Sequence, residues 1–219
     1  MGAIARSAAN LITTSGVVLK GAVNNDSFDN VTALPSAVGE DGITLISSQT
    51  ASNSASISFT SGLTSTYKAY KFILSNIHPR TDSVAFQFNL STDSGSNYNV
   101  TKTTTFFRSF HDEADTSTGV GYVTNSDLAQ STGFQFLNQD GDAGSDADQN
   151  LAGTLTIFNP SSTTYVKHFT ATTQVVAPSD YTLNSFIAGY GNTTSAINAI
   201  QFKMSSGNFD GTIYLYGIK

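Results

Sequence analysis

The sequence predicts an all-β fold, an antiparallel β-sandwich that is jelly-roll-like, preceded by an extended N-terminal arm. The first observation behind this prediction is composition, because the 219 residues include 29 Ser, 29 Thr and 17 Asn but only two Glu and seven Lys. Thr favours pleated strands, Ser and Asn favour turns, and good helix formers are scarce. The second is the recurrence from residue 43 of short segments that alternate apolar and polar residues about every 10 to 15 positions, a pattern typical of sandwiches.

Alternation with a period of two identifies the individual strands. Three such segments are centred on Ala55–Phe59, Tyr70–Leu74 and Val84–Leu90, and a long strand or hairpin arm is expected to follow at Tyr98–Phe110. In the third segment, Gln87 and Asn89 fall on the polar side. Turn residues Asn159–Ser162 predict a hairpin between two further strands, and Ser205–Asn208 predict a second hairpin near the C-terminus.

Residues 1–42 differ from the rest of the chain. They contain a single aromatic residue, Phe28, and no sustained alternation, so they have little capacity to form a core. We expect an arm that becomes ordered on a partner or a neighbouring subunit, with a terminus of no fixed conformation as the alternative. The sandwich domain is then residues 43–219.

The negative charge is concentrated in one region. Residues 109–150 hold eight of the 16 acidic residues and no Lys or Arg, and several glycines interrupt them. We expect acidic loop insertions there, at one end of the sandwich.

Charge and composition exclude several classes of function. The net charge is −6 and the ten Lys and Arg residues are scattered, which argues against a nucleic acid partner. No apolar run approaches the roughly 20 residues of a membrane helix, so we expect no membrane insertion. The absence of cysteine excludes thiol nucleophiles and thiolate metal sites.

Four segments carry a resemblance to a known family. They are TYKAYKFILSNIHP at 66–79, FQFNLSTDSGSNYN at 86–99, GTLTIFNPSST at 153–163 and INAIQFKMSSGNFDGTIYLYGIK at 197–219. Together they resemble a family of tailed-bacteriophage virion proteins whose modules are similar to lectin-like jelly rolls. The resemblance covers roughly residues 43–219, and its motifs mark strands and turns.

The resemblance implies a non-enzymatic virion structural protein at the virion surface, as a head fibre, a capsid decoration or a tail-fibre component. It further implies a homotrimer, with the N-terminal arm attached to other virion proteins and the sandwich in contact with host surface polysaccharide. The alternatives are a secreted, lectin-like carbohydrate-binding module and an atypical glycan hydrolase.

Candidate binding residues lie around the acidic insertion. The aromatic residues Phe106, Phe107, Phe110 and Tyr122 are candidates for a glycan site, because sugars stack on aromatic faces beside amides and carboxylates. Core or subunit-interface packing is the alternative for these aromatics. No cofactor is expected except calcium, for which the candidate ligands are Asp140, Asp142, Asp146 and Asp148. Their spacing departs from an EF-hand loop, and a solvated acidic loop is the alternative.

One segment bears on the hydrolase alternative. Glu113 and Asp115 would share one face of an extended strand and match the first two positions of the E-x-D-x-x-E strand of laminarinase-like glycoside hydrolases. Thr118 occupies the third position and cannot protonate a leaving group, so the carboxyl pair needed for retaining hydrolysis is incomplete. The sequence therefore favours binding over catalysis.

Overall fold

The structure is a computed structural model and describes residues 42–219, so the arm expected at 1–42 lies outside the described residues except for Gly42. The described part holds twelve strands and no helix. The strands are β1 (Ile43–Ser54), β2 (Ile57–Phe59), β3 (Ala69–Pro79), β4 (Phe86–Ser91), β5 (Lys102–Asp112), β6 (Thr118–Tyr122), β7 (Gln135–Phe136), β8 (Leu151–Phe158), β9 (Lys167–Val176), β10 (Tyr181–Gly191), β11 (Ala199–Met204) and β12 (Phe209–Ile218).

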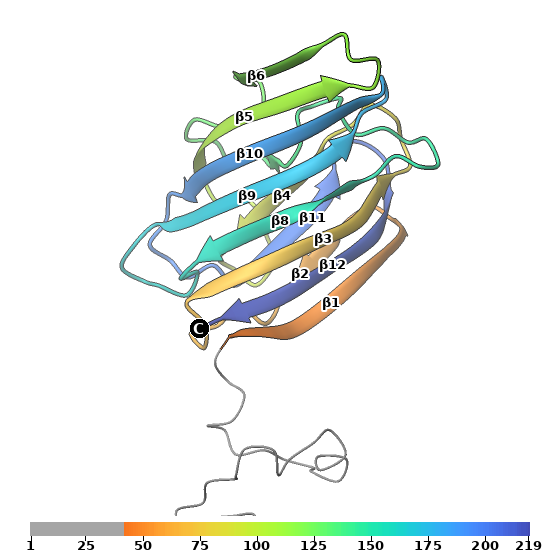
Figure 1. Ribbon diagram of the computed structural model, residues 1–219. Helices are drawn as coiled ribbons and strands as arrows, with labels where there is room; N and C mark the ends of the chain where they lie inside the picture. The colour runs from red at the N-terminus through yellow and green to blue at the C-terminus, as the bar shows by residue number, and fades with distance from the viewer. Residues whose placement is uncertain (1–41) are drawn as a thin grey trace, which may run out of the picture. The chain divides into compact units, whose positions relative to one another are not determined.

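Two antiparallel sheets pack as a sandwich, which confirms the predicted fold class. The large sheet has eight strands in the order β1-β12-β3-β8-β9-β10-β5-β6, and the small sheet has four in the order β2-β11-β4-β7. Figure 1 shows the large sheet in front, with β2, β11 and β4 behind it. Because four strands lie against eight, the small sheet covers only part of the large one.

The two hairpin predictions have opposite outcomes. The hairpin around Asn159–Ser162 is confirmed, because β8 and β9 are antiparallel neighbours and the Ser162 N–H donates to the Asn159 carbonyl at 3.1 Å. The hairpin around Ser205–Asn208 is wrong, because β11 belongs to the small sheet and β12 to the large one. That turn carries the chain across the sandwich, and local alternation does not specify which sheet a strand joins.

A cluster of phenylalanines fills the space between the sheets. Phe202 on β11 lies at its centre, and its ring centroid is 5.4 to 6.4 Å from those of four other rings. These rings come from both sheets and are Phe59, Phe72, Phe86 and Phe88. All five side chains are 0 to 2% exposed, so this cluster is the dry interior on which the sandwich is built.

The polar side of β4 is buried as well. Gln87 and Asn89, expected on the polar side, are both buried: the Gln87 amide donates to the Met204 carbonyl, and the Asn89 amide donates to the carbonyls of Tyr98 and Thr132 in the loops after β4 and β6. Lys102 is fully buried in the same region, where its Nζ donates to Asn89 Oδ1 and to the Val100 carbonyl. The loops after β4 and β6 therefore form an outer layer over the small sheet.

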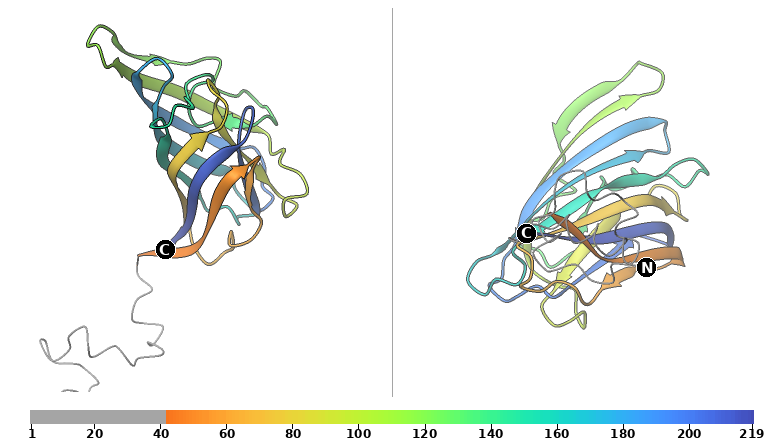
Figure 2. Two further views of the ribbon diagram at one scale, coloured as in Figure 1. Left: turned by 90° about the vertical axis from the view of Figure 1, so that its right-hand side faces the viewer. Right: turned by 60° about the horizontal axis from the view of Figure 1, so that its bottom comes forward.

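The segment 109–150 contains more than loops. It supplies β6 to the edge of the large sheet and β7 to the edge of the small one. After β6 the chain returns along β5, where the backbone of Ser131 exchanges two hydrogen bonds with that of Lys102. Further on, Ala143 pairs with Val84 beside the small sheet. Figure 2 shows this end of the molecule from two further sides. Nowhere in residues 42–219 is there a helix long and apolar enough to cross a bilayer.

Candidate functional site

Two adjoining cavities lie at the β5–β6 end of the sandwich, where the inner face of the large sheet is not covered by the small one. Each has a volume of about 350 Å³, and they share Arg108 and Phe110 as lining residues. The first cavity is bounded by β5, β10, the turn before β10 and residues Gly141 and Asp142. The second lies along β6 and reaches Gln139. We call the two cavities together the groove.

The alternation of β5 explains why Arg108 and Phe110 reach the groove. Inward-pointing residues on this strand begin with Lys102 and continue every second position. Phe106 is the last that the core encloses, and Arg108 and Phe110 follow it beyond the covered region, where both are partly buried. One strand therefore supplies both the interior and the open site.

Two glycines on β6 create room beside these side chains. Gly119 pairs with Phe110 and Gly121 pairs with Arg108. A Cβ atom at Gly119 would lie 2.8 Å from the Phe110 ring, so glycine allows the ring to lie against β6. A Cβ atom at Gly121 would meet no atom within 4 Å, because it would point into the second cavity. Gly121 therefore keeps this part of the groove open.

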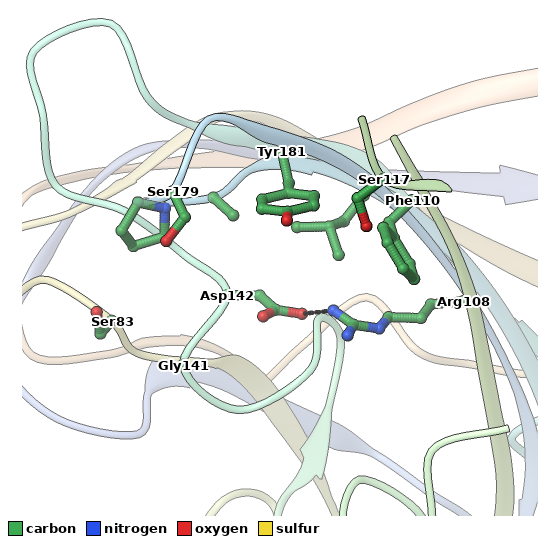
Figure 3. Close-up of a pocket in the computed structure, with 11 residues that line it drawn as sticks. Ser83, Arg108, Phe110, Ser117, Gly141, Asp142, Ser179 and Tyr181 are labelled. Atoms are coloured by element: carbon green, nitrogen blue, oxygen red, sulfur yellow. Dashed lines mark hydrogen bonds and ion pairs between the residues drawn. The ribbon is translucent and has the colours of Figure 1, made fainter. Parts of the chain in front are cut away.

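Aromatic rings form one wall of the first cavity. Phe110 and Tyr181 make an edge-to-face contact with centroids 5.7 Å apart and an interplanar angle of 62°. The Arg108 guanidinium lies 5.3 Å from the Phe110 centroid, within cation–π range. Figure 3 shows both rings on one side of the cavity, with the Arg108 and Asp142 side chains extending toward each other across it.

An ion pair between Arg108 and Asp142 crosses the groove. Arg108 Nη1 donates to Asp142 Oδ2 at 2.8 Å, and the two side chains are 23% and 16% exposed. Burial raises the pKa of Asp142 to about 6, because the loss of hydration outweighs the attraction of Arg108, and Asp140 raises the pKa further. The pair uses one of the five N–H donors of arginine and one carboxylate oxygen, so it keeps both donor and acceptor capacity for a ligand.

The structure separates the four aromatic candidates for glycan binding. Phe106 is fully buried in the core, so its assignment to a surface site is wrong. Phe107 lies on the opposite face of the large sheet, where it stacks on Phe186 with centroids 4.9 Å apart. Phe110 and Tyr122 both line the groove, and the Tyr122 hydroxyl donates to Asp127 Oδ2 at 2.5 Å, which raises the tyrosine pKa.

The four aspartates proposed as calcium ligands do not come together. No group of three or more His, Asp or Glu side chains in residues 42–219 is arranged to hold a metal ion, so the expected cluster is wrong. The reason is that the loop is fixed by other contacts. Asp142 pairs with Arg108, and a backbone hydrogen bond from Gln149 N to the Asp146 carbonyl closes a turn.

The carboxylate pair behind the hydrolase alternative is also not formed as expected. β5 ends at Asp112, and the chain turns over residues 113–116 instead of continuing as a strand. Asp112 Oδ1 accepts from the N–H groups of Thr116 and Ser117, both at 2.8 Å, which fixes the turn. Asp115 has a φ of 55°, and its carboxylate contacts His111 at 3.1 Å. Glu113 and Asp115 therefore do not share a strand face.

Sequence reasoning missed three residues of the groove. Arg108 could have been found, because it is the only Lys or Arg between Lys102 and Lys167 and it shares the inward register of Phe106. Tyr181 and Gly121 carry no comparable signal, because their role depends on pairing between distant strands.

Comparisons with known protein families, with curated proteins and with solved structures find no match for this chain. The fold and the groove themselves define the class: an antiparallel β-sandwich protein with an open, partly aromatic site at one end of its larger sheet.

Proposed function

We propose that this protein is a non-enzymatic virion surface protein whose sandwich domain binds carbohydrate in the groove. The observation that carries the binding proposal is the placement of Phe110 and Tyr181 beside the Arg108–Asp142 pair in an open cavity. A sugar ring offers C–H groups that pack on aromatic rings, and its hydroxyls both donate and accept hydrogen bonds. The groove provides both kinds of contact within one site.

The virion context is supported by the four resembling segments between residues 66 and 219, which include the strand that ends the chain. On this proposal the protein is a fibre or decoration component, it assembles as a homotrimer, and the N-terminal arm, residues 1–42, attaches it to other virion proteins. A secreted lectin-like module is the second candidate, because it would use the same groove. The turn at 113–116 gives the hydrolase alternative no supporting geometry.

Binding can be tested with the full-length protein on immobilised polysaccharides. The panel contains neutral polymers of glucose, mannose, galactose and N-acetylglucosamine, together with galacturonate and mannuronate polymers. We expect the wild type to bind at least one member and Phe110→Ala to lose about tenfold or more in affinity. Phe107→Ala is the matched control, because it removes the same ring from the opposite face of β5. Absence of binding to every member contradicts the carbohydrate proposal, and loss in Phe107→Ala alone moves the site to the outer face.

The assembly proposal has a separate test. Light scattering on the full chain and on residues 42–219, which form a compact unit, should give a trimer in both cases if the arm is reserved for attachment. A monomer in both cases would contradict the virion fibre or decoration proposal and favour the secreted module.

A further inference from the structure

We infer that the groove binds a neutral glycan chain of at least two consecutive sugar units, one on each side of Arg108 and Phe110. Gly121 makes room for the second unit by keeping the second cavity open. The inference rests on the proposed carbohydrate function and adds the class and minimum length of the ligand.

The length follows from the way the cavities are joined. Each has a volume of about 350 Å³, at the low end of the range that binds small ligands, and both are lined by Arg108 and Phe110. A single sugar ring seated against Phe110 and Tyr181 would lie within the first cavity. The second cavity begins on the other side of the same two side chains, so a linked sugar can continue into it along β6.

The two cavities differ in what they offer. The first has the aromatic wall and the ion pair, so it can fix the orientation of one sugar unit. The second is lined largely by the β6 strand and the residues that follow it, from Gly119 to Asn125, together with Gln139. Its polar groups are backbone amides, hydroxyls and side-chain amides, which suit the hydroxyls of a second unit.

The preference for a neutral ligand follows from charge. Arg108 is the only cationic side chain lining either cavity, and Asp142 already neutralises it. The surrounding segment 109–150 contains eight acidic residues and no Lys or Arg. A ligand carboxylate, sulfate or phosphate would therefore enter a negative potential without an unpaired cation to receive it.

Gly121 allows this inference to be tested without disturbing the fold. Its neighbour on β5 is Arg108, and a side chain added there enters open space. Gly121→Gln therefore places an uncharged side chain in the second cavity and leaves the first unchanged. Thr118→Gln is the matched control, because Thr118 is an exposed residue of the same strand, pairs with His111 and lines neither cavity.

The experiment measures binding of the full-length protein to monomers and hexamers of glucose, mannose, galactose and N-acetylglucosamine, and to oligogalacturonate and oligomannuronate hexamers. We expect a neutral hexamer to bind at least tenfold more tightly than its monomer. Gly121→Gln should remove most of that advantage while monomer binding stays within about twofold, and Thr118→Gln should match the wild type.

The outcomes separate the two levels of the proposal. If no saccharide binds, the carbohydrate function itself is wrong. If monomer and hexamer bind equally, or if Gly121→Gln leaves the hexamer advantage unchanged, the function stands and the two-unit inference is overturned. Tighter binding of an oligouronate than of every neutral hexamer would overturn the charge argument.

Discussion

The inner face of the large sheet has a part that the small sheet covers and a part that it leaves uncovered. Both parts follow the same alternation, but the covered part is a dry core and the uncovered part is an open site. Where the small sheet lies over it, inward residues such as Phe72 and Leu215 are 0% exposed and pack on Phe202 or its neighbours. Beyond the small sheet, the inward positions of β5 hold Arg108 and Phe110, which line open cavities. Alternation thus decides which way a side chain points, and the second layer decides whether that position is core or site.

The largest expected effect comes from exchanging one phenylalanine in each part. Phe202→Ala removes a ring that contacts four others and should lower the free energy of unfolding by about 3–5 kcal/mol. Phe110→Ala removes a partly buried ring at the open end and should cost about 1 kcal/mol. Urea denaturation of the two variants and the wild type measures both effects. Equal costs would break the comparison, because Phe110 would then be core.

The sequence was sufficient for the properties that depend on neighbouring residues. Alternation in β3, β4 and β8 correctly identified inward residues such as Phe72, Phe88 and Leu155, and the turn after β8 marked a true hairpin. Sheet membership was not accessible, since the turn at Ser205–Asn208 resembles a hairpin turn yet joins strands of different sheets. Pairing of strands far apart in sequence sets that property.

The groove was also beyond what the sequence could predict, because it depends on contacts between distant segments. Phe110 and Asp142 were both named from the sequence, but for different sites, one as a sugar-stacking ring and the other as a calcium ligand. They meet in one cavity because the loop after β7 returns over the end of β5 and places Asp142 beside Arg108, 34 positions earlier in the chain. Neither composition nor periodicity encodes such a return.

Lys102, at the start of β5, tests how far the covered core extends along the strand that also supplies the open groove. Its ammonium is fully buried with only carbonyl oxygens as acceptors, and burial lowers its pKa to about 7 from 10.5. Between these two values the unfolded chain holds a proton that the folded protein does not, so the free energy of unfolding contributed by Lys102 rises with pH and is lost as pH falls through 7.

The corresponding variant is Lys102→Met, which removes the titrating group at similar length. The wild type should gain free energy of unfolding relative to Lys102→Met as the pH rises from 7 to 10, measured by urea denaturation. Lys203→Met controls for the loss of one positive charge, because Lys203 lies over the Phe134 ring at 4.4 Å on another strand. If the free energy of unfolding had the same pH dependence in the wild type and in Lys102→Met, the Lys102 ammonium would be hydrated. The core under the small sheet would then end before Lys102.

The smallest effect is expected at Asp142, inside the groove, and it has the opposite dependence on pH. Burial raises the pKa of this carboxyl to about 6 from 3.8 although Arg108 opposes the shift, so between these values the folded protein holds a proton that the unfolded chain releases. The free energy of unfolding contributed by Asp142 is therefore fully present below pH 3.8 and is lost as the pH rises through 6. The wild type should lose stability relative to Asp142→Asn over this window in urea denaturation.

Asp93→Asn provides a control of the other sign, because hydrogen bonds from Ser91 and Asn97 hold the pKa of Asp93 at about 2, and its contribution is lost only as the pH falls below 3.8. If Asp142→Asn behaved like Asp93→Asn, the ion pair would dominate over burial, and the groove would be as well hydrated as the outer surface.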